Sequence, residues 1–348
     1  MHSVVSDPAR VLFLGGDIAD YLSVSVLNGL KSISTCEVVD YPKADIIYRE
    51  SRELLEEQIR GKAHFTAFFL HDDRPVNRFH VSLGDLDNFD LVVVGDIQNN
   101  FGLFVQLLPK LNPRKTAILD GSDTQAPYPY HGYFWRRPYY WCLPRAHRRF
   151  LYFKRELTLE TVRHLWLKLV PRRLAKFLPV PRMIKPISFA IPDEKIVSAL
   201  PVKTKDFPRH IVDPDVQKCV EGAFSSYAFD TEELYYADLQ SSRFGITTKR
   251  SGWDCMRHYE IAANGAVICF RDLKKKPSTC APHGLIDGHN CIAYENAVQL
   301  MNRIESLTPD QYSNLQNRGL SWVRENSCCR RAQQLLDFFL PKEIREAS

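Results

Sequence analysis

Long apolar runs are missing from this sequence of 348 residues. A helix that spans a bilayer needs a run of about eighteen apolar residues or more, and none occurs. The N-terminal stretch "MHSVVSDPARVLFLGG" also lacks the basic leader and the small-residue cleavage site that mark a secretory signal. We therefore expect a cytoplasmic protein, and any contact with a membrane would be peripheral, at the inner face of the cell membrane.

A regular disulfide framework is missing as well. The nine cysteines are an odd number in a long chain, and Cys328 and Cys329 are sequence neighbours, which rarely bridge each other. We expect reduced thiols. Internal repeats and low-complexity tracts are also missing, which excludes repeat architectures. A mass of 40.2 kDa exceeds what one hydrophobic core usually serves, so the length favours two domains.

Acidic residues are scarce between His131 and Lys185. This segment holds fourteen Arg or Lys against Glu156 and Glu160, a balance of +12, so the rest of the chain carries −7 of the total charge of +5. Within it, residues 159–178 show apolar and basic positions at helical spacing, with Pro171 as a kink. A basic amphipathic helix is typical of proteins that rest on an anionic membrane surface. An ordinary packed helix with a solvated basic face is the alternative.

Apolar strand patterns alternate with helix-length segments over residues 11–125, which predicts βαβ units and a parallel sheet. The five predicted strands read "RVLFLGG", "CEVVDY", "TAFFL", "DLVVVGDI" and "TAILDGSD". Ligands gather at the carboxyl ends of such strands. The residues expected at these ends are Gly15, Gly16, Asp17, His71, Asp96, Asp120 and Asp123. Each could instead cap a helix or form a turn.

Prolines recur from Pro179 to Pro208, where no long regular element should persist and a connection between domains is expected. We predict one α/β domain over 1–185 with the basic segment 131–185 inserted, a second over 186–330, and a helix over 331–348 that packs back on the first. In the second domain, a helix begins near Asp230 with Glu233 as its capping-box partner. Residues 243–248 and 266–270 read as strands, and Thr308, Pro309 and Gln311 begin another helix.

The stretch "KRSGWDCMRHYEIAANGAVICF" places charges in the turn between two core elements. Lys249 and Arg250 would lie at the carboxyl end of a strand, and Asp254 would cap the helix that follows. A helix N-terminus beside Lys and Arg suits a diphosphate, because free N–H groups and positive charges face the same anion. Gly252 would let the backbone approach closely. Arg257 could bind phosphate oxygens bidentately.

Glu260 lies one turn deeper in the same helix, where a phosphate would be repelled. Its carboxylate could accept two hydrogen bonds from neighbouring hydroxyls of a ribose or a sugar. Cations for a diphosphate and an acceptor for a diol together describe a pocket for a nucleotide sugar. The alternative is that Arg257 and Glu260, three residues apart on one helix, pair with each other on the surface.

The run "HYEIAANGAVICF" resembles the glutamate-containing E-x-x-x-x-G helix in the second domain of GT-B glycosyltransferases, with Glu260 and Gly265 in matching places. Residues 230–275, with "LYFKRELT" and "ILDGSD" upstream, are similar to glycosyltransferase-like proteins of spore-coat and surface-polysaccharide synthesis. The resemblance implies two Rossmann-like domains facing a cleft, a nucleotide-sugar donor held mainly by the second domain, and no obligatory metal or further cofactor. Many retaining members carry an acid where this chain has Gly252, so the stereochemistry stays open.

For an inverting reaction, the catalytic base would come from Asp123, Asp17 or His71, across the cleft from the donor, with Gly15 and Gly16 on the acceptor side. A loop on the donor side contains Cys280, His283, His289 and Cys291, whose irregular spacing argues against a zinc site. His283 could contact a phosphate instead. The Asp85-Leu-Asp87 pattern precedes a strand and reads as a turn, which disfavours a metal-dependent GT-A enzyme.

The predicted function is transfer of a sugar to a surface-glycan or lipid-linked acceptor, without nucleic acid as a partner. Two alternatives stay open. A nucleotide-sugar isomerase or epimerase of the same fold would need paired acid and base groups facing the sugar. A non-catalytic adaptor that contacts membrane through residues 131–185 would not need the Glu260 pocket.

Overall fold

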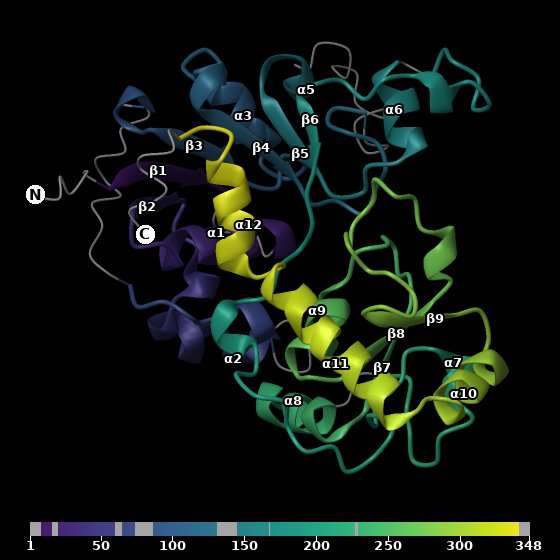
Figure 1. The fold of residues 1–348 in the computed structure, drawn as a ribbon. Helices are drawn as coiled ribbons and strands as arrows, with labels where there is room; N and C mark the ends of the chain where they lie inside the picture. The colour runs from purple at the N-terminus through teal and green to yellow at the C-terminus, as the bar shows by residue number, and fades with distance from the viewer. Residues whose placement is uncertain are drawn as a thin grey trace, which may run out of the picture.

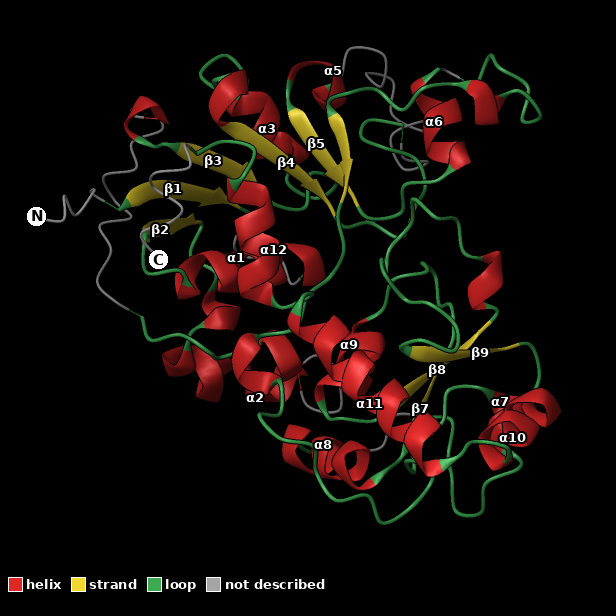
Figure 2. Ribbon diagram, in the orientation of Figure 1, coloured by secondary structure: helices red, strands yellow, loops and turns green. Residues whose placement is uncertain are grey.

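Two separate parallel sheets form in the computed structural model, one of six strands and one of three (Figure 2). The structure describes residues 8–15, 20–59, 65–73, 86–130, 145–166, 168–226 and 229–340. Across these ranges, none of the helices has both the length and the apolar character needed to cross a bilayer.

The six-stranded sheet has the order β2-β1-β3-β4-β5-β6, and every neighbouring pair is parallel. Its strands are β1 (Ala9–Leu14), β2 (Cys36–Tyr41), β3 (Leu91–Val94), β4 (Thr116–Asp120), β5 (Leu151–Lys154) and β6 (Ile184–Pro186). All four residues of β3 and all five of β4 are buried, as expected for strands covered on both faces. Four of the predicted strands are thereby confirmed as β1, β2, β3 and β4.

The helices described in the first half of the chain are α1 (Tyr21–Ser32), α2 (Arg52–Ile59), α3 (Phe101–Leu107), α5 (Ala146–Arg149) and α6 (Leu159–Leu165). Asp20 caps α1, because its carboxylate accepts a hydrogen bond from the Ser23 backbone N–H at 2.8 Å. The nine consecutive residues from Leu22 to Leu30 are buried, so α1 is enclosed by its neighbours rather than lying on the surface.

The three-stranded sheet has the order β7-β8-β9, formed by β7 (Phe244–Thr247), β8 (Val267–Arg271) and β9 (Cys291–Tyr294). Its helices are α7 (Pro214–Gln217), α8 (Glu232–Ser241), α9 (Met256–Ala263), α10 (Ala297–Glu305) and α11 (Pro309–Arg324). Gly265 follows α9 in the left-handed region at φ 67°, which favours glycine. The capping box of Thr308 and Gln311, with Pro309 at the start of α11, is confirmed.

The last helix, α12 (Cys328–Leu336), packs against α1 in the first half (Figure 1). The contact is close at Gly29, where a Cβ atom would lie 2.0 Å from the carbonyl oxygen of Cys328. One hydrophobic cluster contains Val11 and Leu27 from the first half together with Tyr259, Trp322 and others from the second. The two halves therefore share a continuous core.

Several predicted elements are wrong. Residues 66–70 form a single 3₁₀ turn and bends instead of a strand. The predicted helix over 159–178 stops at Leu165, because Lys168 adopts a left-handed φ of 57° and Pro171 lacks an N–H. Thr231 caps α8 in place of Asp230. The proline-rich connection contributes β6, and β5 and β9 were not predicted from the sequence.

Candidate functional site

The carboxyl ends of β4 and β5 meet the loop after β7 at Arg155, whose side chain is 1% exposed. Its Nε donates to the carbonyl oxygen of Gly121 and its Nη1 to that of Asp254, each at 2.9 Å. The guanidinium lies over the Phe189 ring, 4.4 Å from the centroid, and is paired with Asp123 at its Nη2. Arg155 thus joins the two halves where the ends of their strands come together.

Glu156, the next residue, holds the charged turn from the other side. Its Oε1 accepts hydrogen bonds from the backbone N–H groups of Trp253, at 2.8 Å, and Asp254, at 3.3 Å, and its Oε2 accepts from Cys280 Sγ at 3.0 Å. A Cβ atom on Gly252 would lie 2.5 Å from Glu156 Oε1. The close approach that was expected for a ligand at Gly252 is therefore made by a carboxylate of the chain itself.

Asp254 does not cap α9, which corrects the sequence prediction. The residue at the N-cap is Cys255, and it makes no side-chain cap hydrogen bond. The buried carboxylate of Asp254 instead accepts from the Phe189 backbone N–H at 2.7 Å and from the Tyr259 hydroxyl at 2.8 Å. Burial raises the pKa of this carboxyl. Since both oxygens have protein partners, Asp254 supports the turn rather than offering atoms to a donor.

Arg257, on the first turn of α9, carries a buried Nη1 that lacks a hydrogen-bond partner among the described residues. No carboxylate of the described chain forms an ion pair with it, so the expected alternative of a surface pair with Glu260 is wrong. The charge of Arg257 also acts on His210, whose pKa is lowered to about 4 by burial and by that charge. A neutral His210 therefore lies near a guanidinium whose buried Nη1 has no acceptor among the described residues.

Lys249 and Arg250 follow β7 and are exposed, as the sequence predicts. The Lys249 ammonium lies 5.8 Å from the centroid of the Trp253 ring. The Arg250 backbone N–H donates to the carbonyl oxygen of Gly252 at 3.0 Å, which closes the turn. Three cations are thus distributed around the start of α9, at 249, 250 and 257.

Glu260 is buried, and both of its carboxylate oxygens are occupied by hydroxyl groups of the protein. Thr66 Oγ1 donates to Oε1 at 2.6 Å and the Tyr235 hydroxyl donates to Oε2 at 3.0 Å. The Tyr236 hydroxyl in turn donates to Thr66 Oγ1 at 2.8 Å. Burial raises the pKa of Glu260. Glu260 accepts two hydroxyl hydrogen bonds, and both come from residues of the protein, one from each half, whereas a diol of the ligand was predicted to donate them.

Three carboxylates gather at the carboxyl ends of β1, β3 and β4 in the first half. Asp20 lies against Gly121, whose Cβ would be 2.6 Å from Asp20 Oδ1. Asp120 accepts hydrogen bonds from Lys154 Nζ at 3.0 Å and from the Tyr152 hydroxyl. Burial, followed by the charge of Asp20, raises the pKa of Asp96 to about 6. The described residues contain no group of three ligands suited to a metal ion.

The predicted catalytic residues are only partly brought together. Asp123 lies at the end of β4 and is paired with Arg155. His71 lies elsewhere, with its Nε2 3.0 Å from Asn28 Oδ1, and burial lowers its pKa to about 4. Asn28 is eight residues beyond the N-cap of α1, about 12 Å along the helix, so His71 is not adjacent to the Asp20 end. Asp17 and Gly16 lie outside the described residues. Gly15 adopts φ 108°, beside Asn100.

His283 lies apart from the start of α9. An open depression of about 450 Å³ is lined by His283, Trp322 and other residues of α11 and the loop before β9, and it includes none of Lys249, Arg250 or Arg257. Burial lowers the pKa of His283 to about 4. The other candidate zinc ligands are dispersed, since Cys280 contacts Glu156 whereas His289 Nδ1 lies 3.2 Å from an Arg318 Nη1.

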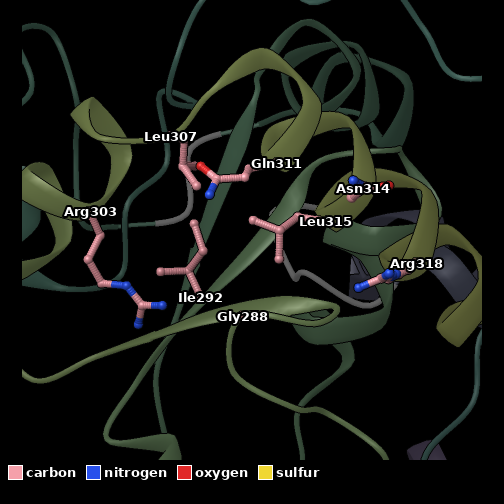
Figure 3. Close-up of a pocket in the computed structure, with 8 residues that line it drawn as sticks. All are labelled: Gly288, Ile292, Arg303, Leu307, Gln311, Asn314, Leu315 and Arg318. Atoms are coloured by element: carbon pink, nitrogen blue, oxygen red, sulfur yellow. The ribbon is translucent and has the colours of Figure 1, made fainter.

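A second cavity, of about 290 Å³, opens between α10, α11 and β9 (Figure 3). Arg303 and Arg318 lie on opposite sides of it, and Leu307, Leu315 and Ile292 line it with apolar side chains. None of the predicted site residues lines it. We therefore take the junction around Arg155 and the start of α9, rather than this cavity, as the candidate site.

Sequence reasoning missed Arg155, Glu156, Asp20 and His210. Arg155 and Glu156 were counted only in the charge of the basic segment, although "LYFK" just before them is a short strand with a buried end. That signal, a charged pair directly after an apolar run, could have located them. Nothing in the sequence around His210 points to its position beside Arg257.

No protein-family model and no curated protein matches the sequence. Solved structures do match. The N-terminal domain of trehalose-6-phosphate phosphatase from Candida albicans has a TM-score of 0.52 at 11% identity, covering 99% of this chain and 98% of that one. The trehalose-6-phosphate synthase OtsA has a TM-score of 0.50 at 10% identity, covering 97% and 99%. HepE from Anabaena, in complex with UDP-glucose, has a TM-score of 0.49 at 10% identity, covering 94% and 98%.

These similarities concern the fold. The neighbours include glycosyltransferases of the GT-B fold, with two Rossmann-like units, and the matches extend over almost the whole chain. The predicted fold class, two α/β units facing each other, is confirmed.

Proposed function

We propose that this protein is a glycosyltransferase that moves a sugar from a nucleotide-sugar donor to an acceptor hydroxyl on a surface glycan or a lipid-linked precursor. The observation that carries the proposal is Arg257, whose buried Nη1 lacks a partner among the described residues at the start of a helix flanked by Lys249 and Arg250. A buried donor without an acceptor is costly. A diphosphate would satisfy it and would place its charge near the helix N-terminus.

The chemistry proposed for this site is stabilisation of the departing nucleoside diphosphate. In glycosyl transfer, negative charge builds up on the leaving phosphate, and fixed cations placed there lower the barrier. Lys249, Arg250 and Arg257 would do this without an obligatory metal ion. For an inverting reaction, Asp123 or Asp96 would be the candidate base. The pKa of Asp96, about 6, lies near neutral pH, as suits a general base.

A ribose would have to compete for Glu260, since Thr66 and Tyr235 already occupy its oxygens. An exchange of one hydroxyl donor for another keeps the carboxylate satisfied, so the buried Glu260 loses no hydrogen bond when the donor enters. Because Thr66 belongs to the first half and Glu260 to the second, donor binding of this kind would require the 65–67 turn to shift away from α9.

The first test is thermal unfolding of the protein with a panel of nucleoside diphosphates and nucleotide sugars, followed by a transfer assay with those that stabilise it. We expect at least one diphosphate to raise the melting temperature. Arg257→Gln should abolish that increase, whereas Arg114→Gln, at an exposed arginine in a turn of the first half, should retain it. A protein that responds to no member of the panel at millimolar concentration would contradict the proposal.

One observation favours a second candidate, a nucleotide-sugar isomerase or epimerase. Such an enzyme needs paired acid and base groups, and Asp96 is close enough to Asp20 for the charge of Asp20 to raise its pKa further. The two functions are separated by incubating the donor without any acceptor and following it by NMR. A new sugar still attached to the nucleotide indicates isomerisation. Release of the free sugar indicates slow transfer to water.

A further inference from the structure

An unusual share of the exposed apolar surface lies in one short segment, which we call the 159–182 projection. The thirteen large apolar side chains exposed among the described residues include six from it: Leu159, Trp166, Leu169, Leu174, Phe177 and Val180. Leu169 is 81% and Phe177 72% exposed. Isolated exposed apolar residues are ordinary, but a concentration of them marks an interaction surface.

The same projection is strongly basic. It contains six cations (Arg163, Lys168, Arg172, Arg173, Lys176 and Arg182) and one acidic residue, Glu160. Glu160 is paired with Arg163 Nη1 at 2.7 Å and with Arg172 Nε at 3.2 Å. Among the described residues, no carboxylate pairs with Lys168, Arg173, Lys176 or Arg182. Four charges therefore stand exposed between the apolar side chains.

The projection is fixed to the body of the protein by buried side chains. Val162, Leu165 and Ala175 are buried, and Leu165 belongs to the same core cluster as Tyr152 and Ile184. A capping box of Thr158 and Thr161 begins α6. The buried residues of the projection pack against the core, and its exposed apolar residues do not. Figure 1 shows α6 and the short elements after it at the outer edge of the molecule, beyond β5 and β6.

We propose that the 159–182 projection docks the protein onto a bilayer that contains anionic phospholipid, with apolar side chains entering the interface and the four cations facing the headgroups. Charge complementarity selects this occupant. Lysine is depleted at protein–protein interfaces, whereas Trp, Leu and Phe interleaved with Lys and Arg are typical of segments that lie in a membrane interface. The structure supplies this surface with turns rather than with the long amphipathic helix that the sequence predicts.

Docking here would bring the candidate site close to the lipid surface. The base of the projection adjoins the junction of the two halves, because the Leu157 carbonyl oxygen accepts a hydrogen bond from Thr279 Oγ1 at 2.6 Å, and Glu156 is the residue before it. If the proposed sugar transfer is correct, the acceptor would then be carried by a membrane lipid. This consequence for the acceptor rests on the proposed function. The docking surface itself stands independently of any sugar transfer.

The test is flotation of the full chain with vesicles of phosphatidylcholine alone and of phosphatidylcholine with phosphatidylglycerol. We expect binding to the anionic vesicles, weaker binding to the neutral ones, and release as salt is raised. Leu169→Ser with Phe177→Ser, and separately Arg173→Gln with Lys176→Gln, should each weaken binding by about tenfold or more.

Matched controls come from the second half. Val202→Ser with Val298→Ser removes apolar side chains of similar exposure, and Lys218→Gln with Lys274→Gln removes the same charge. Both control variants should bind as the unmodified protein does, and thermal unfolding checks that all variants are folded. Failure of the folded protein to float with anionic vesicles would overturn the proposal, and so would an equal loss in the controls. Vesicle binding without any response to nucleotides would overturn only the proposed sugar transfer.

Discussion

At the scale of single residues, burial decides which carboxylates can change their protonation near neutral pH. Asp96 is 5% exposed and adopts a left-handed φ of 39° after β3. Asn99 Nδ2 donates to its Oδ2 at 2.5 Å, which favours the charged form, but burial and the nearby Asp20 outweigh that hydrogen bond. The pKa of Asp96 therefore rises from 3.8 to about 6.

The raised pKa of Asp96 predicts a pH dependence of stability. Below about pH 4 the carboxyl is protonated in the folded and the unfolded chain, so it does not affect the free energy of unfolding. Above about pH 6 it is ionised in both, and the free energy of unfolding is about 3 kcal/mol lower, because the buried site disfavours the charge. Asp96→Asn removes this loss, and asparagine tolerates the left-handed conformation. We expect the variant to be more stable than the unmodified protein at pH 8 and similar to it at pH 4, as measured by urea unfolding.

The control for this prediction is Asp87→Asn, at an exposed aspartate of the same half. It should leave the pH dependence of the free energy of unfolding unchanged. An Asp96→Asn variant whose advantage is the same at both pH values would contradict ionisation as the cause.

The sequence located the cations of the turn before α9 better than the residues that hold the halves together. Lys249, Arg250 and Arg257 were found because a strand, a turn and a helix in succession are visible along the chain. Arg155 contacts Asp254, which is 99 residues away, and Glu260 contacts Thr66, which is 194 residues away. Contacts over such separations depend on how two sheets pack, and no local pattern encodes that.

At the scale of elements, the turn between β7 and α9 owes its shape to a glycine. A Cβ atom at Gly252 would lie 2.5 Å from Glu156 Oε1 and 2.9 Å from Arg155 Nη1, closer than such contacts allow. Here the carboxylate of Glu156, from the end of β5, occupies the space that a side chain at 252 would take.

Gly252→Ala should therefore destabilise the protein by about 1–3 kcal/mol, the usual cost of forcing extra atoms into a packed site. The comparison is Gly102→Ala in α3, where an added Cβ meets nothing within 4 Å and alanine is the better helix former. That variant should be equal to or more stable than the unmodified protein in denaturant unfolding. Equal stability of the two variants would show that the turn can widen without cost.

Two predicted elements were wrong because the backbone conformation did not follow the apolar pattern of the sequence. Residues 159–178 have helical periodicity, yet α6 ends after seven residues, because Lys168 turns into the left-handed region and Pro171 cannot donate a hydrogen bond. The "TAFFL" stretch is apolar enough for a strand, but its Ala67 carbonyl accepts from Asn28 and its Thr66 binds Glu260. In both cases tertiary contacts, rather than propensity, set the local structure.

At the scale of the whole molecule, the two halves are joined by more than the connecting chain. α12 returns to α1, one hydrophobic cluster extends through both halves, and Arg155 and Glu260 each cross the junction. Donor binding of the proposed kind would require some of these links to break while others persist. The contacts of α12 with α1 are extensive and apolar, so we expect them to persist. The single hydrogen bond from Thr66 to Glu260 can be exchanged for one from another hydroxyl.

The link between Thr66 and Glu260 can be tested by substitution. Thr66→Val keeps the shape of the side chain but leaves Glu260 Oε1 without its donor and the Tyr236 hydroxyl without its acceptor, which should lower the free energy of unfolding by about 1–3 kcal/mol. Thr66→Ser keeps the hydroxyl and should cost less, so the difference between the two variants in denaturant unfolding reports the contribution of that hydroxyl and its two hydrogen bonds. If valine and serine at this position give the same free energy of unfolding, Glu260 has found another donor and the two halves do not depend on this contact.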